Sequence, residues 1–408
     1  MVNVVISMLG HQDHGKSTLI GRLLYETKSV TAERIREARE MSEKLGLEME
    51  YCFLLDAFQE EREGGYTLDT TRAQLRHGNT IFELVDVPGH KEFIKNMLSG
   101  ASNASAAILV ASMKPGEGLQ DETRLHVSMA RLLGIKRVIV AVNKVDLAGF
   151  NEKKFNVFAE ELREFLKAAG YDEEPLFIPV SAKLGDNVSR KSGNTPWYGG
   201  PTLLEELAKI AAEDKGLDKM HLRLPVQDVY GGVLVGRVEA GVLRKGDEVL
   251  FTPSGRKAKV TRIIEFGKEL GEARAGNNAG FEVATDTTGL LDNVCSHVDN
   301  PPRLTSKIKA KAFCIAGHSI SKGEALLFKC RNGETRTRVT QITHKKDCRL
   351  FDEADSPEKI VEYELGEMNL ENEDALVLER FEDFPQFGRF VLLKGNAVAG
   401  VGTVEETY

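Results

Sequence analysis

The sequence predicts an α/β domain built on a mainly parallel sheet, followed by two small antiparallel β-barrels. Up to about residue 215, short apolar strand-like runs alternate with amphipathic helical patterns, as in βαβ units. After Gly216 the helical patterns stop, and Val-, Leu- and Phe-rich strands are broken by Gly-containing turns such as RKGD and PSG. The chain has 408 residues, and at about 150 residues per domain this length suits two or three domains.

The first part of the chain alternates predicted strands and helices. Strands are predicted at Asn3–Leu9, Thr80–Val85, Ala106–Ala111, Arg137–Val142 and Leu176–Val180. Helices are predicted at Leu19–Thr27, Thr31–Leu45, Glu122–Leu133 and Lys153–Ala169. Leu68–Arg76 and Thr80–Asp86, joined by HGNT, are expected to form one antiparallel hairpin within this otherwise parallel arrangement.

The predicted domain boundaries are 1–217, 218–302 and 303–408. The seam between the two barrels is expected at Asn300-Pro301-Pro302.

Composition excludes several classes of protein. With 41% hydrophobic and 28% charged residues, the chain is neither disordered nor collagen-like nor a coiled coil. A net charge of −8 excludes a generic polyanion binder, so any RNA contact must be local. The cysteines are scattered without metal-site spacing, which predicts free thiols in a reducing compartment. Without a basic leader or an apolar run of about 18 residues, we expect a cytoplasmic protein with no membrane partner.

A phosphate-binding loop follows the first predicted strand. The run from Gly10 to Thr18, GHQDHGKST, is a full GxxxxGK[ST] motif that opens a helix. Glycines let backbone N–H groups close around phosphates, and the helix N-terminus adds positive potential. Lys16 would reach the β- and γ-phosphates and Ser17 would ligate Mg²⁺. The predicted nucleotide contacts here are Asp13, His14, Gly15, Lys16, Ser17 and Thr18.

Three further motifs stand at or near the carboxyl ends of later predicted strands, where open α/β sheets bind ligands. In Asp86-Val87-Pro88-Gly89-His90, Asp86 would hold a Mg²⁺-bound water and the Gly89 amide would meet the γ-phosphate. In Asn143-Lys144-Val145-Asp146, a carboxylate can accept both N1–H and the exocyclic amine of guanine, a pairing that adenine cannot supply. In Ser181-Ala182-Lys183, backbone amides would contact the guanine oxygen.

The segment between the first two motifs has the pattern of a nucleotide-dependent switch. Thr67, in EREGGYT, would ligate Mg²⁺ only when a γ-phosphate is present. His90 is the best candidate for orienting the attacking water, since phosphoryl transfer depends more on positioning than on covalent help. The full prediction is therefore an α/β P-loop GTPase domain followed by two antiparallel β-barrel domains, with GTP or GDP and Mg²⁺ as ligands.

GHQDHGKST, DVPGH, NKVD and SAK together resemble the translational GTPase family. The long stretch from Thr31 to Arg62, and GDNV followed by PWY, are more similar to elongation factor 1A than to bacterial elongation factor Tu. VGRVEAG and FPQFGRF resemble segments of that family's second and third domains. The resemblance implies a GTP-hydrolysing molecular switch that delivers aminoacyl-tRNA, or a related ligand, to the ribosome.

Two other functions remain compatible with this layout. The GTPase subunit of ATP-sulfate adenylyltransferase shares GDNV, PWY and a compact third domain, and its partner would be a sulfurylase catalytic subunit. A ribosome rescue or termination GTPase is the other alternative. Glu272 matches the family position that meets the terminal adenosine of aminoacyl-tRNA, but because the enzyme subunit can also carry Glu there, this residue does not decide between them.

Three residues depart from the family pattern. Gln12 stands where a small apolar residue is usual, Tyr66 where Ile is usual, and Gly64 where Arg or Gln is usual. The first two positions flank the catalytic His as an apolar gate in the family, so the gate of this chain should be polar on one side and larger on the other.

Charge is unevenly distributed in the last domain. From Arg303 to Leu350 there are 12 Lys plus Arg against 3 Asp plus Glu, and from Phe351 to Gln386 there are 2 against 13. Either neighbouring strands pair these charges across the sheet, or the basic stretch is exposed. In the second case, a tRNA stem would meet Lys329, Arg331, Arg336, Arg338, Lys345 and Lys346.

Overall fold

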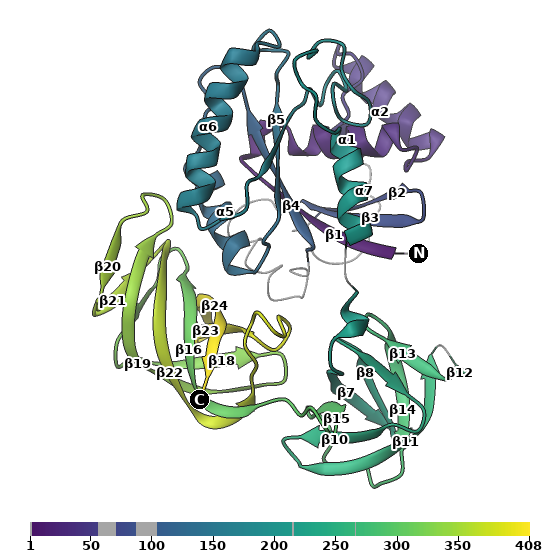
Figure 1. Cartoon of the computed structure of the whole chain (residues 1–408), viewed down its shortest axis with the longest axis vertical. Helices are drawn as coiled ribbons and strands as arrows, with labels where there is room; N and C mark the ends of the chain where they lie inside the picture. Colours follow the sequence, from purple (N-terminus) through teal and green to yellow (C-terminus); the bar gives the residue numbers. More distant parts are fainter. Residues whose placement is uncertain (1, 56–70, 87–103, 214–215, 266) are drawn as a thin grey trace. The chain divides into compact units, whose positions relative to one another are not determined.

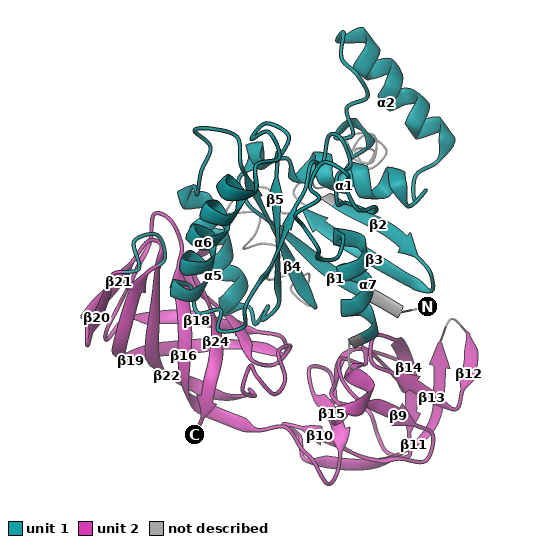
Figure 2. Ribbon diagram, turned by 45° about the horizontal axis from the view of Figure 1, so that its top comes forward, with its two compact units in different colours: residues 1–214, 348–351 teal, residues 215–347, 352–408 magenta. Residues whose placement is uncertain are grey.

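A computed structural model describes residues 2–55, 71–86, 104–213, 216–265 and 267–408 of the chain. The chain divides into two compact units (Figure 2). The first comprises Met1–Asp214 with Cys348–Phe351, and the second comprises Lys215–Asp347 with Asp352–Tyr408. The predicted fold class is confirmed, because the first unit is an α/β domain and the second carries two antiparallel barrels.

The first unit is built on one six-stranded sheet with the order β2-β3-β1-β4-β5-β6. Its strands are β1 (Val2–Leu9), β2 (Thr71–His77), β3 (Thr80–Asp86), β4 (Ala106–Ser112), β5 (Val138–Asn143) and β6 (Leu176–Pro179). All neighbouring strands are parallel except β2 and β3, which form the predicted antiparallel hairpin. The carboxyl ends of the parallel strands therefore meet at one edge of the sheet.

The helices of this unit are α1 (Lys16–Glu26), α2 (Ala32–Lys44), α5 (Asp121–Leu132), α6 (Glu152–Ala168), α7 (Leu203–Glu213) and the 3₁₀ turn η1 (Gln12–His14). Side-chain caps fix two of the starts, since Thr31 accepts from the N–H of Arg34 and Asn151 from that of Lys154. The predicted helices are all present, with ends shifted by a few residues. Among the described helices, α7 is one that the sequence reading did not identify.

Alternating residues of the central strands separate the two faces of the sheet. Val4, Ile6 and Met8 of β1 are fully or almost fully buried in one cluster with the Leu-rich faces of α1 and α7. Figure 1 shows α5 and α6 on the other side of the sheet. Because both faces are covered, the central strands read as continuous apolar runs, and every residue of β4 and β5 is buried.

The first barrel of the second unit has the strand order β10-β15-β7-β8-β14-β11 and is closed by pairing of β10 with β11. Its strands are β7 (Leu224–Tyr230), β8 (Val233–Arg237), β10 (Glu248–Thr252), β11 (Arg256–Glu265), β14 (Asn278–Val283) and β15 (Val294–His297). The short strand β12 (Lys268–Leu270) extends it beyond β11, and β9 (Val242–Arg244) and β13 (Glu272–Arg274) form a separate two-stranded sheet. The short turn η2 (Leu217–Lys219) precedes this barrel.

The second barrel has the order β18-β23-β24-β16-β22-β19 and is closed by pairing of β18 with β19. Its strands are β16 (Leu304–Cys314), β18 (Ala325–Cys330), β19 (Gly333–Asp347), β22 (Glu364–Val377), β23 (Arg389–Lys394) and β24 (Ala397–Thr407). The short strands are β17 (Ser319–Ser321), β20 (Glu353–Asp355) and β21 (Lys359–Val361). Asn300-Pro301-Pro302 lies between the last strand of the first barrel and the first strand of the second.

Each barrel encloses its own apolar core. The cysteines are free thiols, and Cys295, Cys314 and Cys348 are buried. Burial raises the pKa of the Cys330 thiol to about 11, so this half-buried group stays protonated near neutral pH. In the described ranges, no helix combines the length and the apolar character needed to cross a bilayer.

Candidate functional site

The loop between β1 and α1 depends on two glycines. Gly10 has a φ of 124° and Gly15 a φ of 87°, conformations that favour glycine. A Cβ on Gly10 would lie 2.3 Å from the carbonyl oxygen of Val110 in β4. A Cβ on Gly15 would lie 2.6 Å from Nδ2 of Asn143. Any larger residue would push the loop off β4 and β5, so these glycines shape the predicted phosphate cradle.

Lys16 begins α1 and is the buried cation of this loop. Its Nζ donates to the carbonyl oxygen of Gly10 at 2.8 Å, and the residue is only 5% exposed. Burial lowers the pKa of Lys16, while the negative charge of Asp86 at the end of β3 raises it. A buried ammonium at a helix N-terminus suits a polyphosphate, whose charge would relieve the cost of burying the cation. The residues present therefore fit the phosphates of a nucleotide.

His14 supports the same loop from its inner side. The residue is 1% exposed, and its Nδ1 lies 3.2 Å from the carbonyl oxygen of Val110. Burial lowers the pKa of His14 to about 4, partly opposed by the contact with Val110. The imidazole is therefore neutral near pH 7, and the loop carries no cation at this position to compete with Lys16.

Asn143, at the end of β5, connects three motifs that are far apart in the sequence. Its Nδ2 donates to the carbonyl oxygen of His14 at 2.9 Å. Its Oδ1 accepts from the N–H of Ala182 at 3.0 Å. Because Asn143 is 2% exposed, both hydrogen bonds are shielded from water. The phosphate loop and the Ser181-Ala182-Lys183 segment are thus held at a fixed distance by one side chain.

Lys144 provides a second connection to the phosphate loop. Its Nζ donates to the carbonyl oxygen of Asp13 at 2.6 Å and pairs with the Glu117 carboxylate at 2.7 Å. Glu117 also pairs with Lys114 at 2.8 Å. Partial burial raises the pKa of the Glu117 carboxyl, but the hydrogen bonds from Lys114 and Lys144 outweigh it and lower the pKa to about 2. Sequence reasoning missed Glu117, which belongs to none of the motifs.

Asp146 is half-buried one residue after Val145. Its main-chain carbonyl accepts from the N–H of Gly149 at 3.0 Å. Its carboxylate, in contrast, accepts no hydrogen bond from any described residue. A carboxylate without a partner next to the Asn143 and Lys144 connections is available to a base that offers two N–H donors.

The segment after β6 uses almost all of its own backbone donors. Ser181 donates to the carbonyl oxygen of Asp186 and Ala182 to Oδ1 of Asn143. Leu184 donates to Oγ of Ser181 and Gly185 to its carbonyl oxygen. Within Ser181–Gly185, the Lys183 N–H is the one that meets no acceptor among the described residues. It is therefore the amide most suited to a base oxygen.

The candidate Mg²⁺ ligands present hard oxygen donors. Ser17 is half-buried in the first turn of α1, and Asp86 is 9% exposed at the end of β3. In the described part of the chain, no group of three His, Cys, Asp or Glu residues could hold a metal ion. One hydroxyl and one carboxylate suit Mg²⁺, which keeps several waters and takes further ligands from phosphates. Thr67, Gly89 and His90 lie outside the described residues, as do Gly64 and Tyr66.

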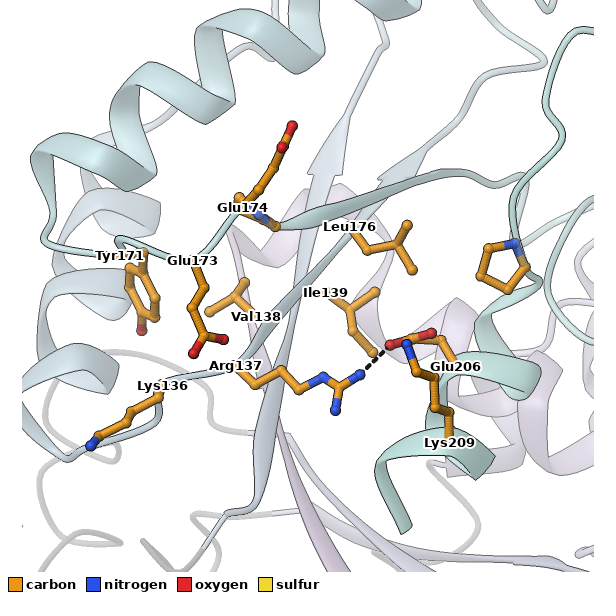
Figure 3. A pocket seen from close by; sticks show the side chains of 12 residues that line it. Lys136, Arg137, Val138, Ile139, Tyr171, Glu173, Glu174, Leu176, Glu206 and Lys209 are labelled. Carbon is orange, nitrogen blue, oxygen red and sulfur yellow. Dashed lines mark hydrogen bonds and ion pairs between the residues drawn. The ribbon is translucent and has the colours of Figure 1, made fainter. Parts of the chain in front are cut away.

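A pocket of about 470 Å³ lies at the amino ends of β5 and β6, away from the carboxyl ends where the motifs lie. Figure 3 shows its apolar floor, with Val138 and Ile139 at the start of β5 and Leu176 at the start of β6. An ion pair between Arg137 and Glu206 closes one side at 2.5 Å. The pocket is separate from the predicted nucleotide site, whose motifs lie at the other ends of the same strands.

In the second unit, most of the basic residues expected to meet a tRNA stem pair within the chain. Lys329 pairs with Glu334, Arg331 with Glu239, Lys345 with Glu364 and Lys346 with Glu353. Arg336 and Arg338 are exposed and form no ion pair with any described residue. Lys345 and Lys346 therefore pair with the acidic stretch, as one of the two interpretations predicts, whereas Lys329 and Arg331 pair with carboxylates outside it. Glu272 pairs with Arg244 and Arg274.

Comparison with known proteins gives matches along almost the whole chain. Residues 1–213 match the elongation factor Tu GTP binding domain, 231–289 match elongation factor Tu domain 2, and 307–405 match the GTP-eEF1A C-terminal domain-like family. Elongation factor 1-alpha of Archaeoglobus fulgidus is 39% identical, with 98% of this chain and 97% of the relative covered. Elongation factor 1-alpha of Aeropyrum pernix is 37% identical, with 99% and 96% covered. A solved structure, sup35 complexed with GDP, matches with a TM-score of 0.45 and 25% identity over 100% of this chain and 94% of that one.

Proposed function

We propose a role in the elongation stage of translation for this chain, which belongs to the translational GTPase family and resembles elongation factor 1-alpha along its whole length. The chain is a GTPase that binds guanine nucleotide and hydrolyses GTP to GDP and phosphate. The contacts of Asn143 carry the proposed assignment of the site, because they connect the phosphate loop with Ser181-Ala182-Lys183, the predicted guanine loop. The finer roles below are proposals for individual residues.

The nucleotide would lie along the edge formed by the carboxyl ends of β1, β3, β5 and β6. The main chain from Asp13 to Thr18 surrounds the phosphates, with Lys16 supplying the charge and Gly89 a further amide. Asp146 accepts two N–H groups of guanine, and the Lys183 N–H donates to its oxygen. Adenine would leave the carboxylate of half-buried Asp146 and the Lys183 N–H without partners, which is the physical basis of selectivity.

Magnesium fits the donors at the phosphate end of the site. Ser17 and Thr67 would supply hydroxyl ligands and Asp86 would hold a water of the ion. When bound, Mg²⁺ neutralises charge on the phosphates. Lys16 contributes to the same neutralisation from the other side, and the main-chain N–H groups at the start of α1 orient the leaving phosphate.

His90 would orient the water that attacks the γ-phosphate, and Thr67 would sense that phosphate. Loss of the γ-phosphate would release the segment that contains Thr67, which gives the protein two states with different partners. Gln12, whose side chain is exposed at the start of η1, replaces the small apolar residue usual in the family, so we propose that restraint of His90 differs here.

The proposed cargo of the GTP state is aminoacyl-tRNA, with the ribosome as the next partner. Arg336 and Arg338 on β19 are the exposed cations best placed to meet a nucleic acid backbone. Reducing conditions suit the free thiols of the chain, and we place the protein in the cytoplasm.

Protection of aminoacyl-tRNA against spontaneous deacylation tests this proposal. The protein is loaded with a GTP analogue and assayed across a salt series, and Arg336→Glu/Arg338→Glu is compared with Lys322→Glu/Lys359→Glu. The second pair makes the same charge change at another exposed site of the same barrel. We expect GTP-dependent protection that the first variant loses and the control keeps.

Absence of protection at low salt would reject the carrier function. Capture of a sulfurylase catalytic subunit on the GTP-loaded protein would then favour the enzyme-subunit alternative. Protection that does not depend on the nucleotide would contradict a switch between two states.

A further inference from the structure

The side chain of Arg22 crosses from α1 to the predicted guanine loop. Its Nη1 donates to the carbonyl oxygen of Lys183 at 3.2 Å, and its Nη2 donates to that of Leu184 at 3.0 Å. Its Nε donates to Glu26, one turn further along α1, at 2.6 Å. The Arg22 side chain is 15% exposed and that of Glu26 14%, whereas Lys183 and Leu184, whose carbonyl oxygens accept from Arg22, are exposed residues. All three nitrogens of the guanidinium are used, and two of them hold adjacent peptide groups of one turn.

Neighbouring residues leave room for this guanidinium and little else. The Arg22 Cζ lies 4.6 Å from the centre of the Tyr51 ring, within the range of a cation–π contact. Gly185 has a φ of 89°, and a Cβ there would lie 2.1 Å from Nη2 of Arg22. A Cβ on Gly21 would lie 1.9 Å from the carbonyl oxygen of Tyr51. Glycine is therefore required at position 185, where a side chain would collide with the guanidinium. It is also required at position 21, where a side chain would collide with the main chain of Tyr51.

Arg22 adds to the hydrogen bonds that the loop forms through its own backbone N–H groups. Each backbone N–H from Ser181 to Gly185 donates within the described structure, except that of Lys183. The two peptide planes that carry the carbonyl oxygens of Lys183 and Leu184 are held on their N–H side, because Leu184 donates to Oγ of Ser181 and Gly185 donates to its carbonyl oxygen. Arg22 holds the carbonyl side of the same two planes, which directly follow the peptide that carries the Lys183 N–H.

We propose that Arg22 is a positioning residue for guanine selectivity. By holding the carbonyls of Lys183 and Leu184, it keeps the Lys183 N–H aimed at the 6-oxo group of the base. The same helix begins with Lys16 at the phosphates, so α1 sets the distance between the phosphate end and the base end of the nucleotide. This inference rests on the proposed assignment of Ser181-Ala182-Lys183 to base binding.

The test compares two nucleotides whose bases differ at position 6 and in the proton on N1. GDP carries the 6-oxo group and the N1–H, whereas the diphosphate of 2-aminopurine riboside lacks both and keeps the exocyclic 2-amino group. The lost N1–H contact to Asp146 is common to the wild type and to variants at position 22, so a change in the ratio of affinities between them reports the contact to the 6-oxo group. Dissociation constants for both are measured by calorimetry with the full chain, for the wild type and for Arg22→Ala. We expect the wild type to bind GDP more tightly than the 2-aminopurine nucleotide. In Arg22→Ala this ratio of affinities should fall about tenfold, which is the value of one well-oriented hydrogen bond.

A ratio of affinities separates positioning from general destabilisation, since loss of folded protein weakens both nucleotides equally. Arg22→Lys can contact only one of the two carbonyls, so it should give an intermediate ratio. Arg36→Ala is the matched control, because Arg36 forms exposed pairs with Glu33 and Glu40 on α2. If Arg22→Ala does not fold, the test uses Arg22→Lys and Glu26→Gln. We expect both variants to show a smaller preference for GDP than the wild type.

The outcomes distinguish this inference from the proposed function. A wild type that binds both nucleotides equally would reject the assignment of Ser181-Ala182-Lys183 to base binding. A wild type that prefers GDP, together with an Arg22→Ala ratio equal to that of Arg36→Ala, would overturn the role of Arg22 alone. The role of Arg22 is supported if the preference for GDP over the 2-aminopurine nucleotide falls in Arg22→Ala and partly recovers in Arg22→Lys.

Discussion

Arg223 and Glu379 form a bidentate ion pair that is almost fully buried. Nε and Nη2 of Arg223 each lie 2.7 Å from a carboxylate oxygen of Glu379, and the two side chains are 2% and 9% exposed. Arg223 precedes β7 of the first barrel, and Glu379 follows β22 of the second. The guanidinium also donates to Asn300 and lies 4.3 Å from the Phe384 ring. All the charge of the pair is thus satisfied within the second unit.

Removal of either partner should destabilise the second unit strongly. Glu379→Gln leaves a buried cation without its counter-ion, and we expect a loss of about 3 to 5 kcal/mol in the free energy of unfolding. Glu371→Gln is the control, since its pair with Lys307 is exposed and should be worth less than about 1 kcal/mol. Urea unfolding followed by fluorescence measures both, and equal midpoints for the two variants would contradict this account.

The parts of the site that sequence could predict are those whose residues lie close together in the chain. The phosphate loop and the Asn143-Lys144-Val145-Asp146 motif each combine their residues within a few positions, so the pattern itself carries the chemistry. Glu117 and Arg22 could not be predicted, because their partners Lys144 and Lys183 lie 27 and 161 residues away. Only the fold brings those pairs together.

The charge pattern of the last barrel shows a related limit. The basic and acidic stretches are visible in the sequence, but whether they pair depends on strand register. In the structure Lys345 and Glu364 lie on β19 and β22, whose residues pair antiparallel, and their side chains meet at 2.7 Å. Each barrel is closed by pairing between the two strands at the ends of its strand order, such as β18 with β19. This closure likewise depends on twist and shear and not on any local motif.

Asp146→Asn should change the base preference of the site. The amide loses one charge-assisted contact to guanine, at a cost of about 2 to 3 kcal/mol in GTP binding, and it can donate to the 2-oxo group of xanthine. We expect xanthosine triphosphate to become the better ligand in a competition titration. Unchanged GTP affinity in the variant would reject the role of Asp146.

Glu117→Gln should loosen the nucleotide without changing the base preference. The Lys144 ammonium loses its carboxylate partner and holds the Asp13 carbonyl less firmly, which we expect to cost about 1 kcal/mol, or about fivefold in the rate of GDP release. Release of a fluorescent GDP derivative measures this rate. Lys114→Ala is the control, because the exposed Lys114 contacts Glu117 but not the loop. A rate in Glu117→Gln no faster than in that control would argue against this connection.

His90→Ala should slow hydrolysis without weakening GTP binding. Orientation of the attacking water lowers the barrier only in the transition state, so the rate falls while the dissociation constant stays the same. Single-turnover hydrolysis and equilibrium binding measure the two quantities separately. Gln12→Val with Tyr66→Ile restores the apolar residues usual in the family and should lower intrinsic hydrolysis. A double variant as fast as the wild type would refute the altered gate.

Stability should fall in mild acid because of His14. Burial lowers its pKa from 6.5 to about 4, with His11 and Lys144 contributing in the same direction and Val110 and Glu117 opposing. Between these two values the unfolded chain binds a proton that the folded chain does not, so acid favours unfolding. The effect is absent above about pH 7 and grows as the pH falls to 4, to at most about 3 kcal/mol.

The variant His14→Gln removes this titration while its amide can still donate to the carbonyl oxygen of Val110. Urea midpoints of the wild type and the variant should therefore differ in their slope between pH 6.5 and pH 4, with the flatter curve belonging to His14→Gln. His77→Gln serves as the control, since His77 is exposed at the end of β2 and its removal should leave the slope of the wild type intact. Glu117 does not confuse the comparison, because its pKa of about 2 places its own loss of stability below pH 4.5, and both variants retain it. If the urea midpoints of the wild type and His14→Gln changed in parallel with pH, the imidazole would not be held neutral inside the phosphate loop. Lys16 would then share the loop with a second cation in mild acid.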